Sequence, residues 1–312
     1  MTSNANKIAF CFPGQGSIEA GMGFDIAEAV PEAMDVFERG SAASGLDLER
    51  LCFHADASEL VDTAVQQPAL VATSLAMLAA IRDRGIEPDF VVGHSVGEFA
   101  ALAAAEAISL EDAMTLVRER GLAMAEAAAA HPGSMAAILG LEDEVVENLC
   151  RGILGVWPAN YNCPGQIVVS GENPAVDECI ERAQEAGARR AVKLKVSGAF
   201  HSPLVARAAD RLRPAIDRVK FEDPVAPFMS TVTARLESAQ RMAPLLVDQL
   251  TAPVRFTQSA SELVREGVRT FVEVGPGNVL SGLVKRIDRS VKAVSVNNLA
   301  ALDKLPETLA ET

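Results

Sequence analysis

The apolar residues of this chain form short uninterrupted runs that are separated by helical patterns. The first run, Ile8–Phe12, is apolar throughout, as expected of a strand covered on both faces. It stops at Pro13-Gly-Gln-Gly16, and a second run ends at Gly93. A late run, Thr270–Val274, ends in Gly275-Pro-Gly277. Strands that alternate with helices predict an α/β fold with a mainly parallel sheet, and its ligand site should lie at the carboxyl ends of the strands.

Between about residues 131 and 197 the pattern changes to short strands and two helices. The predicted elements are a strand over Ser134–Gly140, a helix over Glu142–Arg151, strands over Val156–Asn162 and Gln166–Ser170, a helix over Pro174–Ala186 and a strand over Arg190–Val196. This β-α-β-β-α-β order is that of the ferredoxin-like split unit. We therefore expect a small ferredoxin-like domain at 131–197, inserted into a discontinuous large domain made of 1–130 and 198–312.

The composition is that of a globular protein with an excess of acidic residues. The chain has 312 residues, 49% of them hydrophobic, which is enough for one large domain or two smaller ones. Its net charge of −14 repels nucleic acid and anionic membranes, so we expect neither as a partner, and an anionic ligand would need local basic groups. The longest apolar stretch, Leu70–Ile81, is too short to span a bilayer and predicts a buried helix.

The cysteines and histidines favour neither disulfides nor a metal site. Five cysteines are scattered with no Cys-x-x-Cys pair, and the stretch Met1–Lys7 lacks the apolar segment of a signal peptide. An odd, dispersed set of this kind predicts free thiols in a cytoplasmic protein. The four histidines lack the spacing of metal ligands, so no metal is expected.

The strongest chemical signal is Gly93-His-Ser-Val-Gly97, where an apolar run meets an Ala-rich helical segment. The Gly-x-Ser-x-Gly pattern is typical of a nucleophile elbow, a sharp turn that exposes the serine hydroxyl in a cleft. The N–H of Val96 would point toward a developing oxyanion. Because short glycine-serine strings also occur in ordinary turns, the flanking strand and helix carry the prediction that Ser95 is a nucleophile on an α/β-hydrolase-like core.

A serine nucleophile needs a base, and elimination favours His201. Side chains of consecutive residues diverge at an elbow, so His94 is expected to pack, while His54 and His131 lie in contexts typical of surface loops. His201 lies where a strand ends and a Pro-led helix begins, which suits a cleft, although a capping or core histidine is the alternative. No acidic residue stands out as a third member, so a dyad is expected, with the histidine oriented by a carbonyl or an amide.

Arg120 is the other candidate, at the edge of the apolar stripe of a helix that begins at Ser109. Around the helix it lies about 60° from Val117, whereas Arg118 lies about 100° from Val117 and outside the stripe. Two interpretations stay open at this point. The side chain either covers the helix surface with its stem or turns its guanidinium inward to hold a carboxylate.

Several short motifs occur in an order that resembles one enzyme family. They are Pro13-Gly-Gln-Gly-Ser17, Gln67-Pro-Ala-Leu70, Gly93-His-Ser-Val-Gly-Glu98, Arg120-Gly121, Gly133-Ser-Met-Ala-Ala137, Asn160-Tyr-Asn-Cys-Pro-Gly-Gln166, Ala199-Phe-His-Ser202 and Glu273-Val-Gly-Pro-Gly277. Together they resemble the malonyl-CoA:acyl carrier protein transacylases of fatty acid synthesis and the related acyltransferase domains of polyketide synthases. The resemblance runs from about Phe10 to Ile287, and the ordered set is very specific although no single motif is decisive.

The resemblance implies a catalytic role for each of three residues. Ser95 would be the acylated nucleophile, and His201 would be its general base and later the acid. Gln249 would orient His201 through its main-chain carbonyl, which is consistent with the missing triad acid.

The resemblance also implies the substrate contacts. The N–H groups of Gln15 and Val96 would form the oxyanion hole, Arg120 would bind the free malonyl carboxylate, and Phe200 would narrow the pocket as in malonyl-selective members. The chain departs from the commonest pattern at Ile18, where glutamine is frequent, and at Val96, where leucine is frequent. Neither departure removes a backbone donor, but both could reshape the pocket.

The implied activity is a two-step transfer of malonyl from CoA to the phosphopantetheine thiol of an acyl carrier protein, for fatty acid or polyketide chain extension. It requires no cofactor beyond the CoA thioester, and we expect a monomer. One alternative is a carrier-directed acyl hydrolase on the same scaffold, which Arg120 and Phe200 disfavour. A non-catalytic binding module is the second, and the intact set of Ser95, His201 and Arg120 argues against it.

Overall fold

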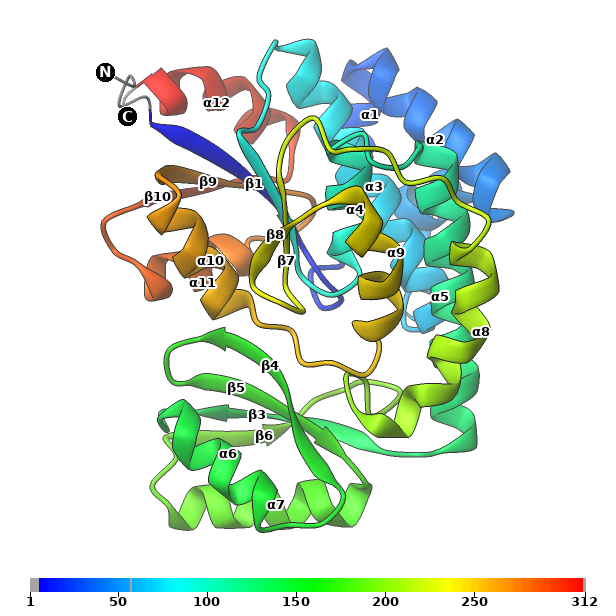
Figure 1. The fold of residues 1–312 in the computed structure, drawn as a ribbon. Coiled ribbons are helices and arrows are strands. Elements are labelled where there is room, and N and C mark those ends of the chain that lie inside the picture. Colours follow the sequence, from blue (N-terminus) through cyan, green and yellow to red (C-terminus); the bar gives the residue numbers. More distant parts are fainter. Residues whose placement is uncertain (1–5, 57, 311–312) are drawn as a thin grey trace.

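The computed structural model describes residues 6–56 and 58–310, and it contains a larger and a smaller sheet (Figure 1). The larger sheet has the strand order β10-β9-β1-β2-β7-β8. Its strands are β1 Lys7–Phe12, β2 Phe90–Gly93, β7 Phe228–Ser230, β8 Arg235–Glu237, β9 Val268–Val274 and β10 Lys292–Val296. Only the β7–β8 pair is antiparallel among these, so the predicted mainly parallel sheet is confirmed. Residues 1–5, where no signal peptide is expected, lie outside the described part.

Helices cover both faces of this sheet. They are α1 Phe24–Ala29, α2 Pro31–Ser44, α3 Thr63–Asp83, α4 Gly97–Ala104, α5 Leu110–Ala130, α8 Ala206–Ile216, α9 Ala239–Asp248, α10 Phe256–Arg265, α11 Val279–Ile287 and α12 Leu299–Ala310, with a π-helical turn at Arg50–His54 and a 3₁₀ turn at Pro203–Val205. Because side chains alternate along a strand, Phe10 and Phe12 of β1 join one buried cluster and Ala9 and Cys11 join the other.

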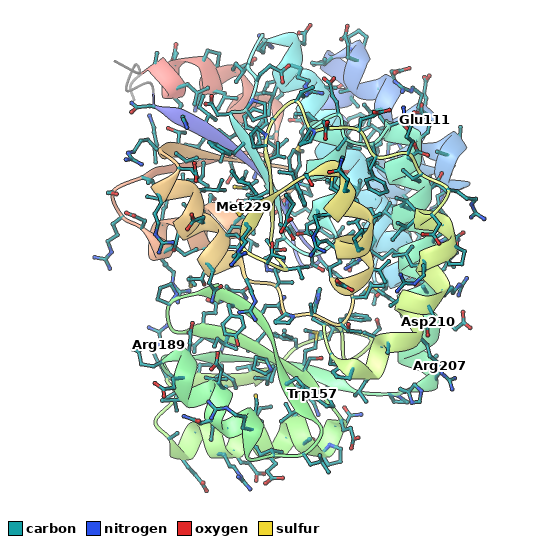
Figure 2. The ribbon with its side chains drawn as sticks, in the orientation of Figure 1. Glu111, Trp157, Arg189, Arg207, Asp210 and Met229 are labelled. Atoms are coloured by element: carbon teal, nitrogen blue, oxygen red, sulfur yellow. The ribbon has the colours of Figure 1, made fainter. Side chains whose placement is uncertain are left out.

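Most apolar side chains lie in the interior of the molecule, and most charged side chains lie on its surface. Met229 of β7 lies inside the molecule, whereas Arg207 and Asp210 point outward from α8 (Figure 2). All five cysteines are buried and free.

Helix α3 corresponds to the apolar stretch that predicted a buried helix. It is long and apolar enough to cross a membrane by length and composition, and the described residues contain one such helix. However, 83% of the most apolar 18-residue segment of this helix is buried inside the protein. This is the behaviour of a core helix.

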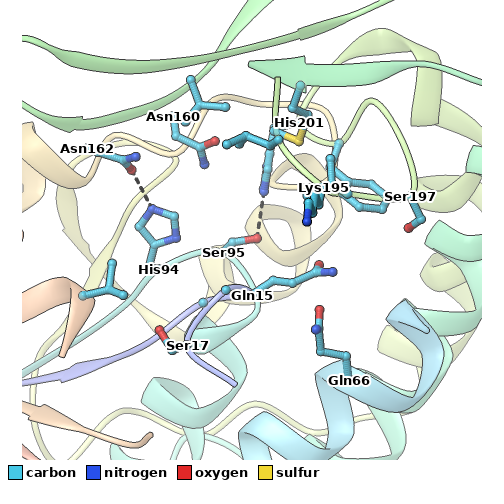
Figure 3. A pocket seen from close by; sticks show the side chains of 18 of the residues that line it. Gln15, Ser17, Gln66, His94, Ser95, Asn160, Asn162, Lys195, Ser197 and His201 are labelled. Carbon is cyan, nitrogen blue, oxygen red and sulfur yellow. Dashed lines mark hydrogen bonds between the residues drawn. The ribbon is translucent and has the colours of Figure 1, made fainter. Parts of the chain in front are cut away.

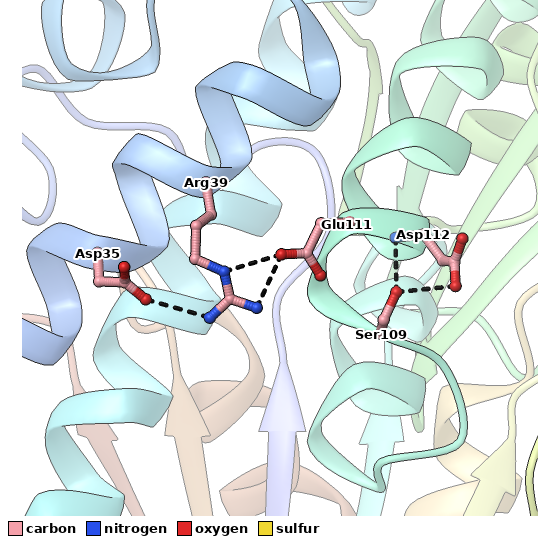
Figure 4. Close-up of polar contacts among 5 residues, drawn as sticks. All are labelled: Asp35, Arg39, Ser109, Glu111 and Asp112. Atoms are coloured by element: carbon pink, nitrogen blue, oxygen red, sulfur yellow. Dashed lines mark hydrogen bonds and ion pairs between the residues drawn. The ribbon is translucent and has the colours of Figure 1, made fainter.

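The first turn of α5 is fixed by polar contacts (Figure 4). The Oγ of Ser109 accepts a hydrogen bond from the Asp112 N–H at 3.0 Å, which is a side-chain N-cap. Glu111 on the same turn forms an ion pair of 2.8 Å with Arg39 of α2. The pair is exposed and contributes only about 0–1 kcal/mol, so the cap and the buried stripe determine where α5 lies.

The smaller sheet is antiparallel, with the strand order β4-β5-β3-β6. Its strands are β3 Ser134–Leu139, β4 Val156–Cys163, β5 Gln166–Gly171 and β6 Arg190–Lys193, and its helices are α6 Asp143–Arg151 and α7 Asn173–Glu185. The chain order is the β-α-β-β-α-β order expected of a ferredoxin-like unit. The domain boundaries at 131 and 197 stay a prediction.

Strand β6 is shorter than the expected Arg190–Val196. Its pairing with β3 ends at Lys193, opposite Ala136. The Leu194 N–H still donates to the Met135 carbonyl at 2.8 Å, after which the chain leaves the sheet, and Leu194–Val196 line a cavity. The alternation of apolar and polar residues over this segment therefore belongs to a cavity wall. A sequence pattern does not distinguish such a wall from a strand.

Backbone hydrogen bonds join the small sheet to the large part. The Tyr161 N–H donates to the Val254 carbonyl at 2.8 Å, and the Val254 N–H donates to the Ala159 carbonyl at 2.8 Å. These bonds fix β4 against the segment before α10, and Asn160 and Asn162 of β4 lie on the wall of the same cavity.

Candidate active site

Ser95 lies in the sharp turn between β2 and α4. Its φ of 53° is in the left-handed region, which non-glycine residues seldom adopt and which is common at functional sites. A Cβ on Gly93 would lie 2.1 Å from the Glu98 nitrogen, and one on Gly97 would lie 2.2 Å from the Phe12 carbonyl oxygen. The turn therefore requires glycine at both positions, in agreement with the Gly-x-Ser-x-Gly pattern.

The loop after β1 lies directly against this turn. A Cβ on Gly14 would lie 2.6 Å from the His94 carbonyl oxygen, so only glycine allows the two backbones to approach so closely. The next residue, Gln15, lies beside Ser95 on the cavity wall (Figure 3). Within the described chain, no hydrogen bond uses the N–H of Gln15 or of Val96. Both donors are therefore free for an acceptor near Ser95.

His201 is hydrogen-bonded to the serine. Its Nε2 lies 2.7 Å from Ser95 Oγ, and its Nδ1 lies 2.8 Å from the Gln249 carbonyl and 3.1 Å from the Ala252 carbonyl. Carbonyl oxygens only accept, so Nδ1 carries the ring proton and Nε2 is the acceptor for the serine hydroxyl. Like Ser95, His201 has a left-handed backbone, with φ 57°.

The surroundings of His201 keep its ring neutral. Burial first, and then the positive charge of Arg120, lower the pKa of His201 from 6.5 to about 3, while the hydrogen bonds to Gln249 and Ala252 oppose the shift. The folded pKa lies below that of an unfolded histidine, so the unfolded chain binds the extra proton between these two values. His201 therefore lowers the stability of the folded state progressively as the pH falls through that window.

We expect the His201 ring to remain in its neutral Nδ1–H form from pH 8 down to pH 5, which is about 1.5 units below the ordinary histidine pKa. Two-dimensional NMR of the ¹⁵N-labelled imidazoles measures this directly, with the His201 signals assigned by their loss in His201→Gln. A titration midpoint near pH 6.5 for His201 would contradict the buried, carbonyl-held ring.

The Arg120 side chain turns inward and is 1% exposed, which decides between the two orientations left open by periodicity. Its Nη1 donates to Gln67 Oε1 at 2.6 Å, and its Nη2 donates to Gln249 Oε1 at 2.9 Å and to Ser95 Oγ at 3.0 Å. Its Nε has no hydrogen-bond partner. Because Arg120 can only donate to Ser95, the serine proton must point to His201.

The guanidinium keeps its charge in this buried place. Burial lowers the pKa of Arg120 to about 9, and the nearby charge of Glu98 opposes the shift. No carboxylate of the described chain lies within ion-pair distance of Arg120. A cation with an unused buried donor thus lies next to the serine, and a carboxylate is the acceptor that would best satisfy it.

Two residues of this network were given no role by sequence analysis. Gln67 on α3 holds Arg120, and Glu98 on α4 accepts a hydrogen bond from Gln249 Nε2 at 2.6 Å. Both lie inside motifs that carry the family resemblance, which was the available signal. Local pattern alone does not distinguish a buried polar side chain from an exposed one.

A cavity of about 530 Å³ opens beside Ser95. The predicted residues on its wall are Gln15, Ser95, Phe200 and His201, and further polar residues there are Ser17, Gln66, His94, Asn160, Asn162, Lys195 and Ser197. The other predicted residues, Val96, Arg120 and Gln249, do not line the cavity. Arg120 Nη2 lies 3.0 Å from Ser95 Oγ, so an acyl group on this oxygen would lie close to the guanidinium.

His94 packs as expected, with its ring centroid 5.7 Å from that of Phe256. Its ring points away from Ser95, as expected at an elbow, but it lines the cavity and its Nε2 lies 2.9 Å from Asn162 Oδ1 (Figure 3). Among the described residues, no group of three or more His, Cys, Asp or Glu side chains is arranged to hold a metal ion.

The protein-family model of the acyl transferase domain matches residues 9–305, which is nearly the whole chain. The chain belongs to the acyl transferase family. This acyl transferase is 44% identical over 311 residues to a Bacillus subtilis (strain 168) protein, malonyl CoA-acyl carrier protein transacylase, with 98% of each chain covered. The sequence-based resemblance to this family is confirmed.

Solved structures agree with this assignment. The acyl-carrier-protein-S-malonyltransferase from Bartonella henselae is similar to this acyl transferase with a TM-score of 0.93 and 39% identity, covering 97% of this chain and 99% of that one. Another similar structure is a malonyl-transacylase in complex with its type II PKS acyl-carrier protein, with a TM-score of 0.93, 37% identity and coverage of 97% and 100%. The predicted α/β-hydrolase-like fold with a small second unit is that of these enzymes.

Proposed function

We propose that this acyl transferase moves a malonyl group from CoA to the phosphopantetheine thiol of an acyl carrier protein. The observation that carries the substrate is the buried Arg120, whose Nε lacks a partner and whose Nη2 lies 3.0 Å from Ser95 Oγ. Malonyl has a free carboxylate one methylene away from its thioester carbonyl. The relatives named for malonyl transfer support the same substrate.

In the first half-reaction His201 Nε2 takes the hydroxyl proton while Ser95 Oγ attacks the thioester carbonyl. The N–H groups of Gln15 and Val96 stabilise the oxyanion of the tetrahedral intermediate. The C–S bond then breaks, and His201 returns the proton to the CoA sulfur. Malonyl-serine and free CoA are the products.

The second half-reaction is the same chemistry in reverse. His201 takes the proton from the phosphopantetheine thiol, the sulfur attacks the malonyl-serine carbonyl, and the C–O bond to Ser95 breaks as His201 protonates Oγ. The two thioesters are chemically equivalent, so the overall equilibrium lies near unity. The activated acyl group arrives on CoA, and no further cofactor is required by this scheme.

A hydrolase on the same scaffold would differ from a transferase in the molecule that accepts the acyl group. We expect malonyl-CoA with holo carrier protein to give malonyl-carrier, and malonyl-CoA alone to give a stable acyl-enzyme with little free malonate. Product analysis by liquid chromatography with and without carrier protein measures both. Rapid malonate release that carrier protein does not suppress would instead establish the hydrolase.

Phe200 is 3% exposed and lies on the cavity wall, so its ring limits the size of the acyl group. We expect Phe200→Ser to relax discrimination against methylmalonyl-CoA by roughly 5–160-fold, because a methyl-sized change in a pocket is worth about 1–3 kcal/mol. Intact-mass analysis after competition between the two CoA esters gives the ratio. Unchanged discrimination would mean that another part of the wall limits the acyl group.

The CoA thioester must approach a protein with a net negative charge. CoA is anionic, and the net charge of −14 opposes its approach at long range. Lys195 on the cavity wall is an exposed local positive charge, whereas the nearby Lys193 is paired with Asp177 at 2.7 Å. Lys195 is therefore the basic group best placed at the cavity for the anionic part of the substrate.

A further inference from the structure

Glu98 is a buried carboxylate on the first turn of α4 and is 1% exposed. One of its oxygens, Oε1, accepts hydrogen bonds from the Thr231 N–H at 2.7 Å and the Thr231 hydroxyl at 2.9 Å. The other, Oε2, accepts a hydrogen bond from Gln249 Nε2 at 2.6 Å. Among the described ion pairs, none involves Glu98. Burial raises the pKa of Glu98 to about 7, while the hydrogen bonds from Thr231 and the charge of Arg120 oppose the shift and favour the carboxylate. Burial of a carboxylate costs free energy unless its oxygens are hydrogen-bonded, and here both oxygens accept such bonds.

The dependent group is the side-chain amide of Gln249. A carboxylate only accepts, so Glu98 requires that the NH₂ of Gln249 face it. The amide oxygen must then point the other way, where it accepts a hydrogen bond from Arg120 Nη2 at 2.9 Å. The carboxylate, the amide and the guanidinium thus form one relay with a single allowed direction.

The amide between the two charges has a chemical consequence. If Glu98 contacted Arg120 directly, it would occupy the donors that a substrate carboxylate needs. Through Gln249 it balances the buried positive charge at one remove, while Arg120 Nε has no hydrogen-bond partner and Nη2 lies 3.0 Å from Ser95 Oγ. The guanidinium is therefore held in place without being neutralised by a bound carboxylate.

We propose that Glu98 is a positioning residue that, through the Gln249 amide, holds Arg120 ready for the carboxylate of the acyl donor and so sets the preference for malonyl over acetyl groups. This inference rests on the proposed function. In this proposal the two oxygens of Glu98 have different roles. Oε1 ties α4 to the end of β7, and Oε2 serves the active site.

The decisive variant is Glu98→Gln, which keeps the size of the side chain but removes the charge and the fixed direction of the relay. We expect the malonyl-to-acetyl ratio of kcat/KM for acylation to fall ~10-fold or more, mainly through a higher KM for malonyl-CoA, with acetyl transfer changed only ~2–3-fold. Quenched-flow acylation followed by intact-mass detection measures both donors.

Two control variants separate positioning from structural support. Thr231→Val removes the hydroxyl bond on Oε1 and should lower Tm while the malonyl-to-acetyl ratio stays at the wild-type value. Glu273→Gln alters another buried carboxylate, which accepts from the N–H groups of Leu280 and Ser281 at the start of α11, and should behave likewise.

Gln249→Met is a second test that does not depend on the folding of the Glu98 variant. It breaks the relay but leaves the main-chain carbonyl that holds His201, so it should lower the ratio as Glu98→Gln does, and the double variant should be no worse than either.

A folded Glu98→Gln or Gln249→Met enzyme with the wild-type ratio would overturn the proposal, as would equal losses with both donors. A wild-type enzyme that does not prefer malonyl-CoA would instead overturn the proposed function.

Discussion

Replacement of Ser95 by alanine should abolish formation of the acyl-enzyme, with a loss of ~10⁴-fold or more in transfer. Ser95 Oγ lies 2.7 Å from His201 Nε2, and its hydroxyl proton is directed to that nitrogen because Arg120 donates to the same oxygen at 3.0 Å. Alanine fits the left-handed turn no worse than serine, so the fold should remain. Intact mass after incubation with malonyl-CoA shows the presence or absence of the adduct.

Ser259→Ala is the matched control for this prediction. Its hydroxyl is buried and, like that of Ser95, hydrogen-bonded, here to the Ser230 carbonyl at 3.3 Å, but Ser259 does not line the cavity. It should acylate as the wild type does. A stoichiometric malonyl adduct that persists in Ser95→Ala would show that another residue is the nucleophile.

Arg120→Ala should change the choice of donor rather than only the rate. Truncating one partner of a buried charged contact costs about 2–5 kcal/mol, so kcat/KM for malonyl-CoA should fall by roughly 30–5,000-fold. Acetyl-CoA no longer leaves a buried cation without a partner and should become comparable to or better than malonyl-CoA. Competition between equal concentrations of the two esters gives the ratio directly.

Arg118→Ala tests whether this effect belongs to the site. Arg118 lies on the same helix but donates to the Ala64 carbonyl at 2.7 Å, outside the cavity wall. Its removal should leave the donor ratio unchanged. If Arg120→Ala also keeps the wild-type preference for malonyl, the carboxylate is recognised elsewhere.

The sequence predicts those parts of the site that depend on local geometry. The elbow at Ser95 follows from glycines that the turn needs on both sides, and the buried strand before it follows from an unbroken apolar run. Elimination among the four histidines also selects the one that the structure places against Ser95, because few candidates had to be compared.

The remaining parts depend on tertiary contacts that local patterns do not encode. Periodicity left the direction of Arg120 open, because its partners Gln67 and Gln249 come from other elements. Strand β7, Phe228–Ser230, is too short to show a period. The sequence pattern predicts a β6 that is three residues longer than observed, because Leu194–Val196 keep a strand-like alternation while they line the cavity.

The most direct test of malonyl transfer through Ser95 is peptide mapping of the acylated wild-type enzyme. After brief incubation with malonyl-CoA and acid quench, proteolysis and tandem mass spectrometry should place a single malonyl group on Ser95. Holo carrier protein added to the acylated enzyme before the quench should remove this group. A malonyl group on a different residue, or no covalent adduct while malonyl-carrier still forms, would contradict the account.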